Sequence, residues 1–140
     1  MRYLVIIFLL CVLVKPLVAQ AILEGPVTKI RDGDTIEVGQ IPIRIQGLTC
    51  DELNTAKGQE ARIILHHLLS GKQAICRLNG QVSYDRLIGR CAIAELGDIG
   101  KYLIKDGYCG RCKRYDEDGF YAETQKKSGD YNGIMPSYCG

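Results

Sequence analysis

The chain has 140 residues, the size of one domain. Its 18 Lys and Arg residues against 16 Asp and Glu residues give a net charge of +2, and Arg2 and Lys15 in the first 21 residues account for this excess. Without that segment the charges balance, so no general basic field attracts polyanions. The composition therefore excludes a protein that coats nucleic acid passively.

Residues 1–21 have the pattern of a secretory signal peptide, with a positive start, an apolar run over residues 3–14 and small residues near the cleavage site. The alternative is a membrane anchor, but the apolar run is shorter than the roughly 20 residues that span a bilayer. Lys15-Pro16 also interrupts it. We therefore expect a secreted or periplasmic protein with one domain at residues 22–140 and no contact with a membrane.

Alternating apolar and polar residues predict three short strands at the start of this domain. The first covers residues 27–31, the reversal signal Asp32-Gly33-Asp34 follows, and the second covers residues 35–38. The third covers residues 41–45. We expect its isoleucines at 41, 43 and 45 to be buried and Arg44 to point to the opposite face.

The apolar period then changes to that of a helix. Apolar residues at i, i+3, i+4, i+7 and i+8 predict an amphipathic helix over residues 59–69. A fourth strand over residues 73–78 and a fifth over residues 87–93 follow, joined by a polar loop at residues 79–86. Cys76 and Cys91 lie in these two strands, so we expect them to face each other and form a disulfide.

Two short helices complete the expected set. Asp98 is a suitable N-cap for the first, Gly107 ends it, and residues 120–127 form the second. The order predicts an α+β chain that is mainly β: a five-stranded OB-fold barrel with about three helices. Such barrels commonly bind oligonucleotides or oligosaccharides on one face.

Six cysteines remain once Cys11 has left with the signal peptide, and six thiols allow fifteen pairings. Besides the strand pair, a bond between Cys112 and Cys139 would fasten the C-terminal tail and leave Cys50 for Cys109. The alternative is a zinc site on Cys109-x-x-Cys112. It lacks a second close pair of ligands, and an exported chain favours disulfides.

Several motifs occur in the order in which they occur in secreted thermonucleases. They are DGDT at 32–35, IRIQGLTCDE at 43–52, GQEA at 58–61, YDRLIGR at 84–90, GDIGKYLIKDGY at 97–108 and YAETQKKSGDYNGIM at 121–135. Residues 22–140 resemble the staphylococcal nuclease family over almost their whole length. The resemblance implies a Ca²⁺-dependent monomeric nuclease that cleaves DNA and RNA and leaves 3′-phosphate ends.

The resemblance marks Arg44, Glu52 and Arg90 as catalytic residues and Asp34 as a metal ligand. The chemistry suits these residue types, because guanidinium groups bind the charged oxygens of a phosphodiester and a carboxylate can take a proton from the attacking water. A cation held by Asp34 would neutralise phosphate charge and orient that water. Tyr108, Tyr115 and Tyr121 fall where the family's loops border the substrate groove. We expect one of them, with Tyr115 as the candidate, to stack on a base and at least two to serve packing.

Each of these residues also has a purely structural interpretation. Asp34 belongs to a hairpin turn, Arg44 to an exposed strand face, and Glu52 to the start of a helix. Arg90 has Asp85 as a candidate ion-pair partner. The two histidines, His66 and His67, are adjacent on a helix and point about 100° apart, which excludes the paired acid and base of a histidine ribonuclease.

One departure from the family concerns the metal. Thr49 stands where the family usually has a second acidic ligand, and Asp51 is expected to point elsewhere because successive strand residues face opposite sides. The segment before Arg90 is also one residue longer than usual. The alternative function is therefore a catalytically silent OB-fold module that binds nucleic acid and has lost its metal site.

Overall fold

Five strands of the computed structural model, which describes residues 20–140, form a closed hydrogen-bonded ring. The antiparallel order is β3-β2-β1-β5-β6, and a parallel pairing between β3 and β6 closes the ring. The ring strands are β1 (Ile22–Ile30), β2 (Thr35–Val38), β3 (Ile41–Ile45), β5 (Gln73–Ser83) and β6 (Arg86–Ile93). The predicted α+β class with a five-stranded, barrel-like sheet is confirmed. The predicted signal peptide falls almost wholly on residues 1–19, outside the described part.

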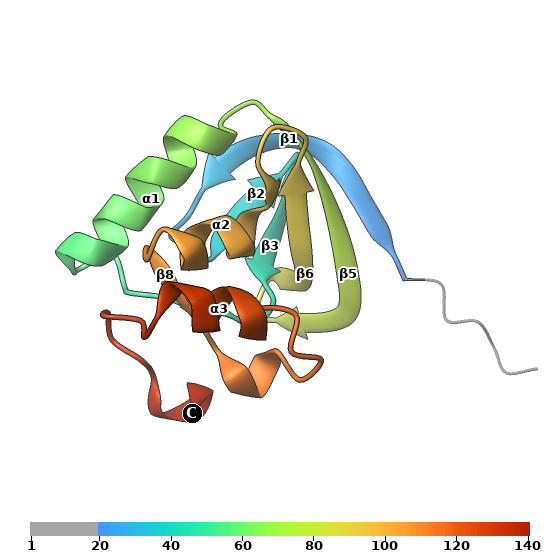
Figure 1. The fold of residues 1–140 in the computed structure, drawn as a ribbon. Helices are drawn as coiled ribbons and strands as arrows, with labels where there is room; N and C mark the ends of the chain where they lie inside the picture. The colour runs from blue at the N-terminus through green and yellow to red at the C-terminus, as the bar shows by residue number, and fades with distance from the viewer. Residues whose placement is uncertain (1–19) are drawn as a thin grey trace, which may run out of the picture.

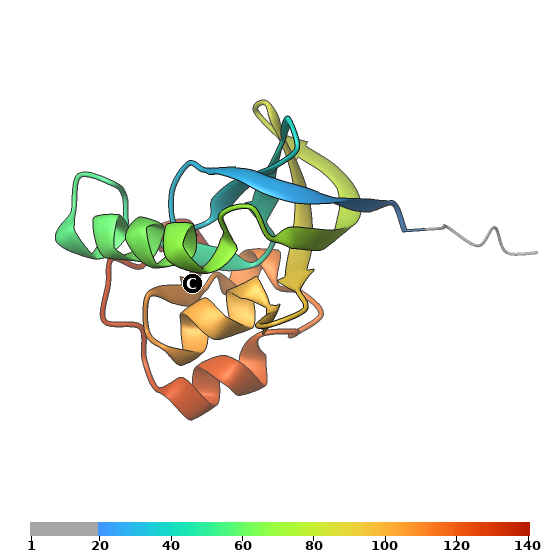
Figure 2. The ribbon, with the colours of Figure 1, turned by 90° about the horizontal axis from the view of Figure 1, so that it is seen from above.

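Short strands and three helices complete the fold. They are β4 (Leu48–Cys50), α1 (Ala56–Leu69), β7 (Gly97–Asp98), α2 (Ile99–Lys105), β8 (Cys109–Arg111) and α3 (Ala122–Ser128), with single 3₁₀ turns at Lys113–Tyr115 and Ser137–Cys139. β7 extends the sheet beside β6, and β4 pairs with β8 in a separate two-stranded sheet. All three helices lie on one side of the ring (Figure 1), and the view from above places α3 farthest from the strands (Figure 2).

The core lies between the inner face of the ring and the apolar faces of α1 and α2. Its fully buried side chains include Ile36, Ile43, Ile45, Leu65, Leu103 and Tyr121. Ile43 and Ile45 are buried as predicted, but Ile41 is 39% exposed, which corrects that expectation. It is the first residue of β3, next to the Gly39-Gln40 turn, and only its partner Val38 on β2 is buried there.

The polar loop predicted at residues 79–86 is wrong. β5 continues to Ser83 and β6 starts at Arg86, so only Tyr84 and Asp85 make the turn, and Tyr84 has a positive φ of 58°. The far part of this hairpin projects beyond the core, because Gln81 and Val82 are exposed. A strand without a buried face has no apolar alternation, and this is why the sequence pattern missed it.

Side-chain caps explain where two helices start, and one of them, Asp98, was predicted. Asp98 caps α2 by accepting a hydrogen bond from the Lys101 amide at 2.8 Å, as expected. α1 starts three residues earlier than predicted because the Thr55 hydroxyl accepts from the Gly58 amide at 3.0 Å. Gly58 has a steric role there, since a Cβ would lie 2.1 Å from the Glu52 carbonyl oxygen.

Three disulfides join the strands and the tail, in the pairing that was expected: Cys50–Cys109, Cys76–Cys91 and Cys112–Cys139. Disulfides are typical of proteins that fold in an oxidising, extracytoplasmic compartment. No helix within residues 20–140 has the length and apolarity needed to cross a membrane.

Candidate functional site

Asp34 and Arg44 meet on the outer side of the β2–β3 hairpin. Asp34 immediately precedes Thr35, which pairs with Arg44 across the two strands. One Asp34 carboxylate oxygen lies 3.1 Å from Arg44 Nη2. Arg44 also donates to the carbonyls of Ile45 at 3.0 Å and Leu48 at 2.9 Å, so its guanidinium is fixed at the β3–β4 turn. The structure therefore brings these two sequence-predicted residues together.

The environment of Asp34 disfavours its charged form. The pKa of Asp34 is raised to about 7: burial is the main cause, Arg44 opposes the change, and nearby Asp32 adds to it. The Thr35 hydroxyl donates to Asp34 Oδ1 at 3.2 Å, and the Asp34 amide donates to Asp32 Oδ1 at 3.0 Å. One guanidinium offsets only part of the desolvation cost, so near neutral pH the group titrates.

Arg86 extends this cluster across the ring closure. Its Nη1 donates to the Thr35 hydroxyl at 3.0 Å, and its Nε and Nη2 donate to the Ser83 carbonyl and hydroxyl. Two hydrogen bonds and one ion pair thus connect Arg86 through Thr35 and Asp34 to Arg44. Within the described chain no carboxylate lies within ion-pair distance of Arg86, so its charge is not neutralised.

Arg86 was missed by the sequence analysis, and the strand register explains why. Arg44 pairs with Ile88 in the parallel β3–β6 ladder. Arg86 and Arg90 lie two residues before and after Ile88 on the same face of β6, because side chains alternate along a strand. The register alone therefore places either arginine one step from Arg44. Motif similarity pointed to Arg90. The neighbouring side chains show where each of the two arginines is bound.

Arg90 is bound to a different cluster. Its Nη2 lies 2.9 Å from Asp116 and 2.7 Å from Asp118, and its guanidinium lies 4.4 Å from the centre of the Phe120 ring. Asp116 is fully buried and also pairs with Arg111 at 2.6 Å. The structure therefore does not join Arg90 to Arg44. Arg90 does not pair with Asp85 either, because Asp85 binds Arg31.

Glu52 stands apart from both clusters. Its side chain is exposed and has no hydrogen bond or ion pair to any residue between 20 and 140. Its backbone carbonyl accepts from the amide and hydroxyl of Thr55, both at 2.9 Å, just before α1. The helix-start role considered from the sequence is thus present, and it leaves the carboxylate unrestrained.

The residues near Asp34 do not fit the expected calcium site. Ca²⁺ takes six to eight oxygen ligands. Thr49 is buried, and Asp51 accepts from the Tyr131 hydroxyl and the Ile134 amide, both at 2.7 Å, so it points to the C-terminal segment. Asp34 itself is bound to Arg44. In the part of the chain that the structure describes, no three His, Cys, Asp or Glu side chains form a metal-binding group.

A groove of about 1190 Å³ adjoins the arginine cluster. Three arginines and three tyrosines contribute to its lining, together with polar residues of the β5–β6 hairpin and two acids, Glu117 and Asp118. The arginines and tyrosines are Arg44, Arg86, Arg114, Tyr84, Tyr115 and Tyr138. Asp118 is neutralised by Arg90, so the groove combines cationic and aromatic groups. Arg90, Asp34 and Glu52 are not among its lining residues.

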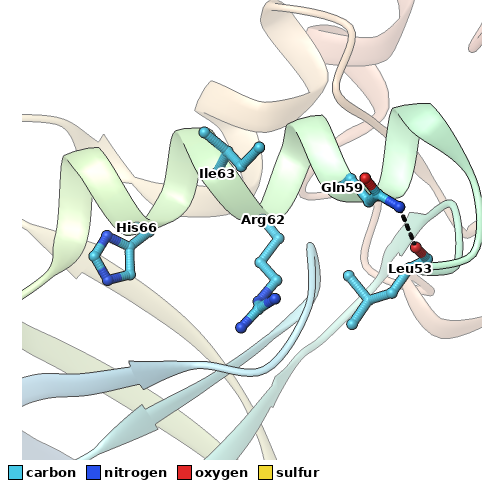
Figure 3. Close-up of a pocket in the computed structure, with 5 residues that line it drawn as sticks. All are labelled: Leu53, Gln59, Arg62, Ile63 and His66. Carbon is cyan, nitrogen blue, oxygen red and sulfur yellow. Dashed lines mark hydrogen bonds between the residues drawn. The ribbon is translucent and has the colours of Figure 1, made fainter.

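A second, smaller pocket of about 390 Å³ lies beside α1, where Arg62 also donates to the Ile30 carbonyl at the end of β1. Its lining includes Leu53, Gln59, Ile63 and His66, with Arg62 as the cation, and Figure 3 shows Gln59 donating to the Leu53 carbonyl at 3.1 Å. No residue of the arginine cluster lines it. His66 and His67 are both exposed on the helix, and neither contributes to the groove.

Tyr115, expected at a substrate groove, lines the larger groove beside the arginines. Tyr138 also lines it, and no sequence pattern pointed to this residue. The tail position of Tyr138 depends on the disulfide between Cys112 and Cys139.

Comparisons of the chain with models of known protein families and with curated proteins found no match.

Proposed function

We propose that this chain is a secreted or periplasmic nuclease that hydrolyses phosphodiester bonds of DNA and RNA with little sequence preference. The observation that carries the proposal is the connection of Arg86 to Arg44 by two hydrogen bonds and one ion pair through Thr35 and Asp34, beside a groove lined with aromatic side chains. The resemblance of the motifs to staphylococcal nuclease agrees with it.

In this proposal the two arginines bind the phosphate. A phosphodiester under attack gathers negative charge on its non-bridging oxygens, and guanidinium groups stabilise that charge with paired hydrogen bonds. Arg86 is the better anion receptor in the free protein, since no acid neutralises it. Arg44 is held in place by Asp34 and two carbonyls, and within the described residues its Nε has no partner.

Glu52 remains the proposed proton acceptor for the attacking water. A general base of this kind contributes roughly 10²–10⁴-fold to the rate. The side chain of Glu52 has no restraint in the free protein, so it must turn toward the bound phosphate before it can act. Catalytic hydrogen bonds often form only in the substrate complex. No step is assigned to calcium, because the donor set does not suit it.

The second candidate is a module that binds nucleic acid without cleaving it. The specific observation in its favour is that Glu52 contacts neither arginine and that Thr49 and Asp51 supply no metal ligand. The groove is the same in both proposals, so only a measurement of cleavage separates them.

The test is cleavage of fluorescent DNA and RNA oligonucleotides by the purified chain, with added Ca²⁺ and with a chelator. Glu52→Gln, Arg44→Ala and Arg86→Ala should each reduce cleavage at least a hundredfold, since each removes a transition-state contact. Arg77→Ala is the matched control: it is an exposed arginine on β5 outside the groove and should cleave normally. Binding without cleavage by the wild type would reject the nuclease and favour the silent module.

A further inference from the structure

The last residues of the chain are fastened to the groove by one covalent bond. Cys139 is buried and bonded to Cys112, just before the 3₁₀ turn that carries Tyr115. Beyond Ile134, whose amide binds Asp51, the only other hydrogen bond among the described residues of the tail is internal, from the Cys139 amide to the Pro136 carbonyl. The disulfide therefore sets the position of residues 136–140.

This bond places Tyr138 against Tyr115. Their ring centres are 6.2 Å apart with an angle of 61° between the planes, an edge-to-face contact. The rings come from segments 23 positions apart in the sequence, and both line the groove. Each residue is still about half exposed, at 49% for Tyr115 and 50% for Tyr138. The pair thus keeps aromatic surface open to a ligand.

The charges around the pair suit a polyanion with flat bases. Arg114 lies 5.7 Å from the Tyr115 ring centre and has no carboxylate partner within residues 20–140. Arg86 lies in the same groove on β6 and is also without an acidic partner. Of the two acids in the lining, Asp118 is bound to Arg90, so Glu117 is the one unpaired negative charge among the described lining residues. Aromatic rings that alternate with cations in a groove are typical of sites for single-stranded nucleic acid.

We propose that Tyr138 is a substrate-binding residue that contacts an unpaired nucleobase, and that the Cys112–Cys139 disulfide holds it in position. This inference takes from the proposed function only that the ligand is a nucleic acid. It does not require that the protein cleaves it. It assigns the C-terminal segment a binding role, because the tail lines the groove together with the β5–β6 hairpin.

The experiment measures equilibrium binding of a short fluorescent single-stranded DNA by anisotropy, in chelator, with a self-complementary duplex as comparison. Tyr138→Ala should weaken single-strand binding about tenfold, the effect of losing one stacked base. Tyr138→Phe keeps the ring and should bind within twofold of the wild type. The double variant Cys112→Ser/Cys139→Ser should lose as much affinity as Tyr138→Ala, and adding Tyr138→Ala to it should change little further.

The outcomes separate this inference from the nuclease. Equal single-strand affinity of Tyr138→Ala and the wild type overturns the role of Tyr138, whatever the cleavage assay gives. No binding of either oligonucleotide by the wild type overturns it as well. Tenfold weaker binding by Tyr138→Ala supports it, even where the wild type fails to cleave and the nuclease is rejected. Circular dichroism of each variant checks that the fold is retained, and Tyr138→Ala replaces only a half-exposed side chain.

Discussion

Arg86 and Arg90 are the same residue type, four positions apart on one face of one strand, and their neighbours give them different roles. The segment after β8 brings Asp116 and Asp118 to Arg90, and Thr35 brings only a hydroxyl to Arg86. A buried carboxylate needs a charged partner, because an unpaired charge in the interior is strongly destabilising. Arg90 is therefore committed to the fold, and Arg86 is available to bind an anion.

This difference predicts that substitutions of the two arginines change the free energy of unfolding by different amounts. Arg90→Ala should lower the free energy of unfolding by about 2–3 kcal/mol, since Asp116 loses one of its two guanidinium partners but keeps Arg111. Arg86→Ala should lower it by less, about 1–2 kcal/mol, because Arg86 forms no ion pair and loses only its hydrogen bonds to Thr35 and Ser83. Urea unfolding curves measure both. Wild-type stability of Arg90→Ala together with loss of cleavage would return the catalytic role to Arg90.

Asp34 predicts a dependence of stability on pH. Its pKa is raised from 3.8 to about 7 in the folded chain, so the folded state holds the proton more tightly than the unfolded state does. The stability from this proton is complete below about pH 4 and lost as the pH rises through about 7. Asp34→Asn, which cannot ionise, should therefore gain stability over the wild type between pH 4 and 8, on the order of a few kcal/mol. A constant difference in melting temperature across this range would contradict the prediction.

At the scale of elements, the residue pattern predicted the strands and helices that have one buried face and missed strand segments that have none. The alternation in β2 and β3 and the helical period of α1 reflect contact with one core, so these elements were found within a few residues. The outer half of the β5–β6 hairpin faces water on both sides and was predicted as a loop. The ion pairs of Arg90 with Asp116 and Asp118 were not foreseen for a related reason, because they depend on segments after β8 that no local pattern connects to β6.

The link between the β4–α1 connection and the C-terminal segment can be tested at Asp51. One oxygen of this side chain accepts from both the Tyr131 hydroxyl and the Ile134 amide. Asp51→Ala should cost about 2 kcal/mol and make the segment after α3 sensitive to protease, since a partly buried amide and hydroxyl lose their charged acceptor. Tyr131→Phe removes one of these hydrogen bonds and should cost about half as much. Limited proteolysis with mass spectrometry reads out the cut site, and cleavage elsewhere in the chain would refute the link.

At the scale of the whole molecule, the disulfides connect parts that the ring alone leaves separate. Cys76–Cys91 joins two neighbouring ring strands, Cys50–Cys109 joins β4 to β8, and Cys112–Cys139 joins the tail to the groove. The Cys76–Cys91 bond could be predicted from the sequence, because both cysteines lie in adjacent predicted strands. The other two depended on elimination among four cysteines, because the β4–β8 pairing is non-local. The groove beside the ring is thus lined in part by a C-terminal tail that the Cys112–Cys139 disulfide attaches to the segment after β8.

The three bonds should differ in their effect on stability. In the loop-entropy account a disulfide stabilises by restricting the unfolded chain, more for a longer loop. The cysteines are 59 positions apart in Cys50–Cys109, 27 in Cys112–Cys139 and 15 in Cys76–Cys91. Replacing each pair by serine or alanine should therefore cost about 4 kcal/mol for the first and about 3 kcal/mol for the last. Denaturant unfolding of the three double variants measures the order, and a largest loss for Cys76–Cys91 would show that strain or packing within the ring outweighs loop length.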